Sequence, residues 1–130
     1  MKYLSSLETK ERGIDLAHPF FDYIPPDDVE EIKQEINDGL SHLLCLEENK
    51  AIIAAFIITH YDDRIHIREI GGDYVRATKH VNSFAEQVAK ALGIGVVSFT
   101  AKNPIIQKRS EIYGYKPSNQ YKNEFERTVN

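Results

Sequence analysis

The first half of the chain combines one amphipathic helical stretch with three short apolar runs. Val29, Ile32 and Ile36 fall on one face of a helix over residues 27–38, whose first turn is acidic and which Gly39 follows. Three strand-like runs, separated by short polar turns, come next: residues 42–47, 51–59 and 64–70. The central run is apolar on both faces, as a fully buried strand is. The pattern therefore predicts a three-stranded antiparallel meander.

The second half predicts a βαβ unit. A loop is expected over residues 71–76, followed by a helix over 80–92 and a strand over 95–101. The helix is indicated by apolar residues at helical spacing: Val81, Phe84, Ala85, Val88, Ala91 and Leu92. Strand 64–70, this helix and strand 95–101 should form two parallel strands joined by a right-handed crossover.

The two ends of the chain complete the predicted sheet. Asn103 caps a further helix with Pro104 at its first position and Gly114 past its end, and the residues after it supply one or two edge strands. Residues 2–5 favour a short strand, whereas residues 8–21 leave a helix before Pro19 and irregular structure open. The predicted class is α/β: a single domain over residues 1–130, with a mixed central sheet flanked by helices.

Composition indicates the class of protein and the cellular compartment to expect. Of the 130 residues 42% are hydrophobic and 28% charged, as in an ordinary globular protein. The longest apolar run, residues 51–58, is far shorter than a membrane span, and the first residues lack the apolar core of a signal peptide. Cys45 is the one cysteine, which excludes an internal disulfide and favours a structural thiol. We therefore expect a cytoplasmic protein without a membrane partner.

Charge is unevenly distributed along the chain. Residues 1–75 hold 7 Lys and Arg against 16 Asp and Glu, whereas residues 76–130 hold 9 against 4. Both halves could be solvated surfaces, or the basic half could meet an anionic ligand. Nucleic acid is not expected, because no dense basic stripe with interleaved aromatics is present. An aromatic cluster beside prolines could seat a protein partner or pack in the core: Phe20, Phe21, Tyr23 and Ile24.

The late part of the chain carries a family resemblance. In NPIIQKRSEIYGY the spacing of Asn103, Gly114 and Tyr115, together with the preceding VNSFAEQVAKALGI, resembles the Gcn5-related N-acetyltransferases (GNAT). The resemblance covers about three quarters of the chain from residue 26 onward. It is similar in particular to small phage-encoded proteins, including internal virion and assembly proteins, through Asn37-Asp38-Gly39 and Ile70-Gly71-Gly72. It implies a GNAT sandwich whose two parallel strands splay apart at one end.

The same resemblance implies a site for acetyl-CoA. The family holds the diphosphate with backbone amides of a Gln/Arg-x-x-Gly-x-Gly/Ala loop at a helix start, and Asn103 belongs to the same site. The matching residues are Arg76, Ala77, Thr78, Lys79, His80 and Val81. Lys79 and Val81 stand where small residues belong, which argues against the usual cradle. Lys79 and His80 could contact phosphate by charge instead, and Gly71-Gly72 could form either a displaced turn or the end of a strand.

Proton-transfer groups also depart from the family pattern. The late-helix tyrosine that donates a proton in the family corresponds to Ser110, so Tyr113 is the substitute, unless it packs in the core. Glu69 is the candidate general base, with a contact to Arg68, Arg64 or water on a solvated face as the alternative. His60 and His66 lie near acidic residues, but nothing fixes a third ligand, so no metal is expected.

Two functions follow from these observations. One is an accessory, virion-associated or other binding protein on a GNAT scaffold, with no cofactor required. The other is an active acetyl-CoA-dependent N-acyltransferase on an unknown amine. The departures at Lys79, Val81 and Ser110 favour the first. The sequence leaves the substrate, the partner and the oligomeric state open.

Overall fold

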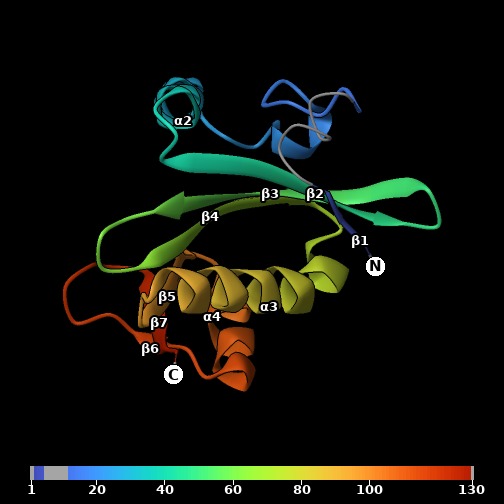
Figure 1. Cartoon of the computed structure of the whole chain (residues 1–130). Coiled ribbons are helices and arrows are strands. Elements are labelled where there is room, and N and C mark those ends of the chain that lie inside the picture. Colours follow the sequence, from blue (N-terminus) through green and yellow to red (C-terminus); the bar gives the residue numbers. More distant parts are fainter. Residues whose placement is uncertain (1, 5–11, 130) are drawn as a thin grey trace.

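The structure is a computed structural model that describes residues 2–4 and 12–129, and it contains one twisted sheet with helices on both faces (Figure 1). The helical elements are η1 (Pro19–Phe21), α2 (Pro26–Asn37), α3 (Tyr74–Leu92), α4 (Pro104–Ser110) and η2 (Glu111–Tyr113). The strands are β1 (Lys2–Leu4), β2 (Ser41–Glu48), β3 (Ala51–His60), β4 (Ile65–Gly72), β5 (Val96–Thr100), β6 (Lys116–Pro117) and β7 (Glu124–Thr128). None of the described helices is both long and apolar enough to cross a membrane.

The sheet has the strand order β1-β2-β3-β4-β5-β7-β6. Strands β1 to β4 are antiparallel, β4 and β5 are parallel, and β5, β7 and β6 are antiparallel again. The predicted meander, the parallel βαβ unit and the mixed sheet are thereby confirmed. The last strands differ from the expectation in one respect: β7 lies inside the sheet between β5 and β6, and only β6 is an edge strand.

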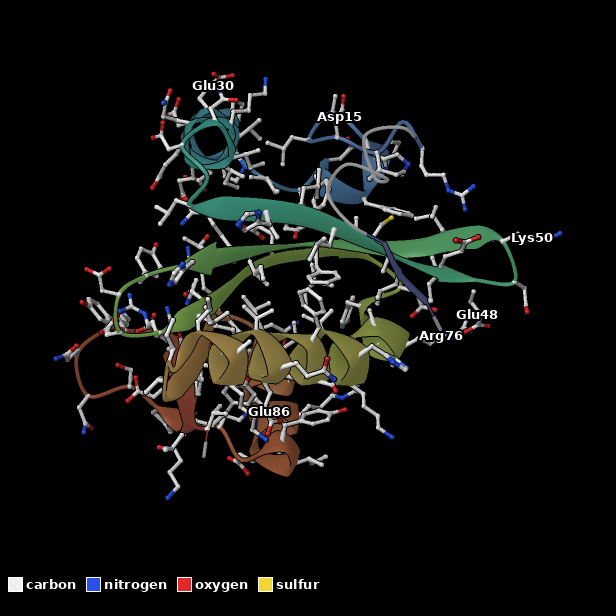
Figure 2. The ribbon with its side chains drawn as sticks, in the orientation of Figure 1. Asp15, Glu30, Glu48, Lys50, Arg76 and Glu86 are labelled. Atoms are coloured by element: carbon white, nitrogen blue, oxygen red, sulfur yellow. The ribbon has the colours of Figure 1, made fainter. Side chains whose placement is uncertain are left out.

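Each face of the sheet has its own apolar core. Helix α3 covers one face through residues spaced along one side of the helix, among them Ala77, Val81, Ala85 and Ala89, which are all fully buried. Helix α2 and the segment before it cover the opposite face, where Phe21 and Ile32 pack against β2 and β3 (Figures 1 and 2). Cys45 of β2 is buried in this second core. Because both faces are covered, β3 is apolar on both sides, as its sequence indicated.

The loop expected over residues 71–76 is wrong, as is the predicted start of α3. Gly71 and Gly72 are still paired with β3, opposite Ala55 and Ala54. Asp73 alone joins β4 to α3, which begins at Tyr74 instead of residue 80. The apolar periodicity did not reveal this first turn because its side chains, Tyr74, Val75 and Arg76, are exposed.

The predicted strand over residues 2–5 and the undecided stretch over 8–21 are described only in part. Lys2–Leu4 is a strand, and residues 5–11 lie outside the described residues. From residue 12 the chain forms turns up to the short 3-10 helix η1, so no helix is described in residues 12–18. At the other end Asn103 caps α4 and Gly114 ends η2 with φ 87°, both as the sequence predicts.

Strands β4 and β5 pair along only part of their length. Their register joins Ile65 to Val97, His66 to Ser98 and Ile67 to Phe99. Beyond Ile67, β4 continues to Gly72 on β3 alone, whereas β5 ends at Thr100 and the chain turns into α4. The two strands therefore splay apart at their C-terminal ends, which confirms the expectation drawn from the family resemblance.

The end of β4 is held against η1 by a close backbone approach. A Cβ on Gly71 would lie 2.2 Å from the carbonyl oxygen of Phe20. No side chain fits there unless η1 moves away from the sheet. Gly71 thus marks the contact between β4 and the N-terminal segment, and Gly72 ends β4 against β3, so the pair forms the end of a strand rather than a displaced phosphate turn.

We predict that Gly71→Ala lowers the free energy of unfolding by about 2–3 kcal/mol, because η1 must shift to admit the methyl group. Urea denaturation followed by circular dichroism measures the change. Gly95→Ala is the matched control, since a Cβ there would meet nothing closer than 4.0 Å. It should change stability by less than about 0.5 kcal/mol. Equal stability of the two variants would contradict the close approach.

Candidate functional site

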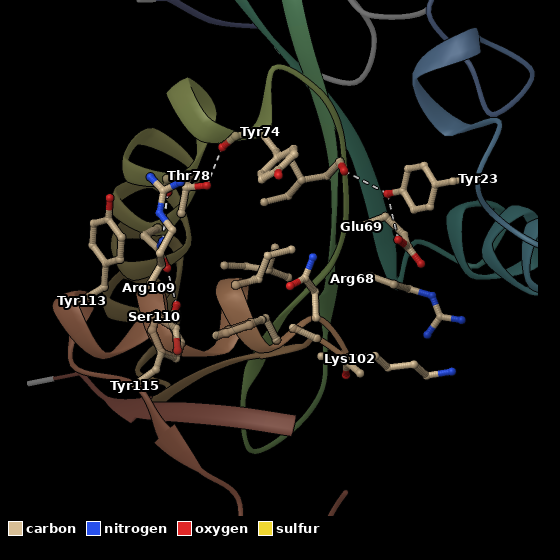
Figure 3. A pocket seen from close by; sticks show the side chains of 18 residues that line it. Tyr23, Arg68, Glu69, Tyr74, Thr78, Lys102, Arg109, Ser110, Tyr113 and Tyr115 are labelled. Atoms are coloured by element: carbon tan, nitrogen blue, oxygen red, sulfur yellow. Dashed lines mark hydrogen bonds between the residues drawn. The ribbon is translucent and has the colours of Figure 1, made fainter. Parts of the chain in front are cut away.

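A cavity of about 390 Å³ opens where β4 and β5 separate (Figure 3), and we call it the β4–β5 cleft. One wall is β4 from Ile67 to Ile70, and another is the side of α3 that carries Tyr74, Thr78 and Asn82. The remaining wall comes from the end of β5, the following residues up to Asn103, and α4. The volume lies in the range of small-molecule sites in proteins.

Four buried or half-buried groups pack together in the cleft. The phenol of Tyr115 donates a hydrogen bond to Asn82 Oδ1, and the rings of Tyr115 and Phe99 meet edge to face with centroids 4.8 Å apart. Asn82 Nδ2 donates to the carbonyl oxygen of Thr78 at 2.9 Å, and Thr78 Oγ1 donates to that of Tyr74. These polar groups are therefore satisfied within the protein, and the bond from Tyr115 joins α3 to the segment between η2 and β6.

Glu69 lies in the wall formed by β4, beside Tyr23 from the N-terminal segment. The Tyr23 hydroxyl is 2.9 Å from Glu69 Oε2 and 2.9 Å from the carbonyl oxygen of Ile70 (Figure 3). Burial raises the pKa of the Glu69 carboxyl above its usual range, and the hydrogen bond from Tyr23 offsets part of that rise. Burial also raises the pKa of the Tyr23 phenol, with the Glu69 charge adding to it. This pair places a carboxyl of raised pKa in contact with the cavity.

The arginines proposed as alternative partners of Glu69 are engaged elsewhere. Arg68 lies 3.4 Å from Glu31 and 3.5 Å from Glu35, both on α2. Arg64 lies 3.0 Å from Asp63 and 3.6 Å from Glu124. Among the described residues neither arginine forms a salt bridge with Glu69, so its hydrogen-bonded neighbour is a phenol.

Ser110 and Tyr113, the candidate proton donors, both line the cleft. The Ser110 hydroxyl is buried and donates to the carbonyl oxygen of Gln107 at 2.6 Å, which directs it back into α4. Tyr113 is half-buried in η2, packed against the core beneath α3. Tyr113 therefore presents a phenol beside the cleft, whereas the Ser110 hydroxyl is engaged by its own helix.

The start of α3 already carries a negative charge. Asp73 is the N-cap, and its carboxylate accepts a hydrogen bond of 3.2 Å from the Arg76 amide. The Arg76 guanidinium pairs with Glu48 at the end of β2 and lies 3.8 Å from Asp73 (Figure 2). The positive end of the helix dipole and the nearby cation thus both face carboxylates of the protein itself.

The residues matched to the diphosphate motif lie within a helix rather than in a loop. Residues 76–81 lie inside α3, where the Ala77 amide donates to the carbonyl oxygen of Asp73 at 3.0 Å. Ala77 and Val81 are fully buried against the sheet, so both are core residues. Of this set Thr78 lines the cleft, whereas Arg76, Lys79 and His80 do not.

Asn103 both caps α4 and lines the cleft. Its Oδ1 accepts a hydrogen bond of 2.9 Å from the Ile105 amide. Sequence reasoning did not assign Tyr23, Asn82 or Arg109 to the site, although all three line it. The aromatic cluster at residues 20–24 was the available signal for Tyr23; Phe21 and Ile24 of that cluster are core residues.

His66 is a buried strand residue beside Ser98. Its Nδ1 lies 2.7 Å from Ser98 Oγ and 3.4 Å from Glu124 Oε1. Burial, together with the charges of Arg64 and Arg68, lowers the pKa of His66 to about 4, so the ring is neutral at pH 7 and the Glu124 contact is not an ion pair. Within the described part of the chain, no group of three His, Cys, Asp or Glu side chains is placed to hold a metal ion.

Comparison with known proteins identifies the fold. No family model matches the chain, and no curated protein matches it. Among solved structures, PaiA N-acetyltransferase from Thermoplasma acidophilum in complex with coenzyme A is 13% identical, with a TM-score of 0.67 over 99% of this chain and 100% of that chain. An acetyltransferase of the GNAT family from Staphylococcus aureus Mu50 is also 13% identical, with a TM-score of 0.65 over 99% of both chains. The AtaT–AtaR complex bound to DNA is 10% identical, with a TM-score of 0.65 over 98% of this chain and 94% of that chain. The chain therefore has the GNAT fold.

We predict that Tyr23→Phe raises the pKa of the Glu69 carboxyl further, because it removes the hydrogen bond that favours the ionised form. NMR titration of the side-chain carboxyl carbon of Glu69 measures the shift. Tyr74→Phe is the control, since Tyr74 lines the same cleft but has no hydrogen bond to Glu69 among the described residues. A pKa that stays constant or falls in Tyr23→Phe would show that the phenol does not support the carboxylate.

Proposed function

We propose that this GNAT-fold protein binds a small ligand in the β4–β5 cleft and does not hold a diphosphate at the start of α3. On this proposal it acts as a binding or accessory protein rather than as an acetyltransferase of the usual kind. The observation that carries the proposal is the Asp73 carboxylate capping α3, where the family places phosphate.

Acetyl-CoA, the cofactor implied by the fold, does not fit this helix start. A single residue links β4 to α3, which leaves no glycine-rich turn whose amides could surround two phosphates. The Asp73 carboxylate would lie beside any such anion and repel it. Arg76 is paired with Glu48, so a phosphate would have to compete for it with a carboxylate of the protein.

The accessory role draws its support from the cleft and from the sequence pattern. The cleft holds a cavity that could admit a ligand. The hydroxyl of Ser110, at the family's proton-donor position, is hydrogen-bonded within α4. The resemblance to phage-encoded internal virion and assembly proteins supplies the setting in which we place this role, with another protein as its partner. The AtaT–AtaR structure provides a precedent for a GNAT-fold protein in a complex with another protein.

An N-acyltransferase is the second candidate, and Glu69 is the observation that favours it. A carboxyl of raised pKa in a cleft wall is suited to accept a proton from an amine near neutral pH. Thiol release from acetyl-CoA in the presence of an amine, lost in Glu69→Gln, would establish this activity. If thiol release is no faster with the unmodified protein or with Glu69→Gln than without protein, the N-acyltransferase candidate fails and the binding role remains.

We predict that acetyl-CoA and acetyl-pantetheine at the same millimolar concentration raise the melting temperature equally, because the diphosphate finds no favourable contact. Asp73→Asn should add a gain specific to acetyl-CoA, on the order of 1 kcal/mol in affinity. Asparagine caps a helix as well as aspartate does but carries no charge. Differential scanning fluorimetry measures both comparisons.

Asp62→Asn is the control for net charge, since Asp62 is an exposed residue of the turn between β3 and β4. In this variant acetyl-CoA and acetyl-pantetheine should still raise the melting temperature by equal amounts. The proposal is wrong if acetyl-CoA stabilises the unmodified protein by several degrees more than acetyl-pantetheine does.

A further inference from the structure

The charged side chains that line the β4–β5 cleft are three cations and one carboxyl: Arg68, Lys102, Arg109 and Glu69. Arg68 is committed to Glu31 and Glu35 of α2. In Figure 3, Arg68 and Lys102 extend away on the side of β4, whereas Arg109 reaches from α4 toward Thr78 of α3. Arg109 is therefore the cation that lies between α4 and α3, in the wall opposite Glu69.

Arg109 has no acidic partner within residues 2–4 and 12–129, because none of the salt bridges described there includes it. It is exposed on the last turn of α4, next to the buried Ser110. Its guanidinium thus retains its hydrogen-bond donors for a ligand. The one carboxyl of the cleft, Glu69, lies in the opposite wall and is bonded to Tyr23.

The hydrogen-bond donors deeper in the cleft are already used within the protein, so they are not available to an anion. Asn82 and Thr78 donate to carbonyl oxygens of α3, and the Tyr115 phenol donates to Asn82. The lining of the cleft also includes apolar and aromatic side chains, namely Phe99, Ile106 and the ring of Tyr113. A ligand that fills this space therefore needs an apolar body and one anionic group.

We infer that the β4–β5 cleft takes a small organic anion, with its anionic group on Arg109 and its apolar body against Phe99, Ile106 and Tyr113. This inference rests on the ligand-binding role proposed above for the cleft. It moves the anion-binding position from the start of α3, where Asp73 opposes it, to the end of α4. It also gives a location to the anionic ligand that the positive charge of residues 76–130 suggested.

The test uses the full-length protein, four ligands that share one six-carbon chain, and amide chemical-shift titration by NMR. Hexanoate and hexyl phosphate carry an anion, 1-hexanol is neutral, and hexylamine is a cation. At least one anion should bind about tenfold more tightly than 1-hexanol, as expected for a charge-assisted hydrogen bond to arginine. The tighter of the two anions distinguishes a carboxylate ligand from a phosphate ligand.

Arg109→Gln should reduce the affinity for the anion to that for 1-hexanol. Lys108→Gln is the matched control, because it removes one positive charge from the same turn of α4 at a residue that does not line the cleft, and it should change affinity less than about twofold. The inference is overturned if 1-hexanol binds as tightly as both anions, or if both variants lose the same affinity. If none of the four ligands shifts the amides of Thr78, Asn82 and Ile106, the ligand-binding role itself fails, and the inference fails with it.

Discussion

The structure depends on the edge of β4 that faces β5, because this edge is paired for the first residues of β4 and unpaired for the rest. Pairing with β5 ends at Ile67, and the backbone beyond it must satisfy its polar groups in another way. The N-terminal segment does part of this, since the Tyr23 phenol lies within hydrogen-bonding distance of the Ile70 carbonyl oxygen. The same segment covers the end of β4, where Phe20 packs on Gly71. The open edge creates the cleft, and the segment that stabilises the edge supplies one of the residues lining it.

This arrangement explains which parts of the fold the sequence predicts. The strands of the meander and the buried side of α3 follow from local apolar spacing, and the cap at Asn103 follows from the residue type at one position. The start of α3 does not, because its first turn faces solvent and Gly71-Gly72 resembles a loop. Gly71 is explained by Phe20, about fifty residues earlier, and Gly72 by its φ of 86° and its approach to Ile53 of β3; no local pattern indicates such contacts.

The same distinction applies to the candidate site. Glu69, Ser110, Tyr113 and Asn103 were predicted from spacing within a known fold, and all four line the cleft. The hydrogen bond between Tyr23 and Glu69 joins residues 46 positions apart. The pairing of Arg76 with Glu48 joins residues 28 positions apart. Such contacts decide the pKa of a carboxyl or the charge at a helix start, and they become visible only when the sheet is assembled.

The carboxylates at the start of α3 have a consequence for how the helix responds to its surroundings. Asp73 lies within one turn of the amides it faces, a separation shorter than the Debye length of about 8 Å at physiological ionic strength. Arg76 and Glu48 are in direct contact as well, but both side chains are partly exposed, so dissolved salt weakens their pair as it weakens other surface ion pairs. Through Glu48 the end of β2 is thus joined to α3 by one contact that weakens as ionic strength rises, whereas the apolar packing of α3 on β2 and β3 contains no such charge pair.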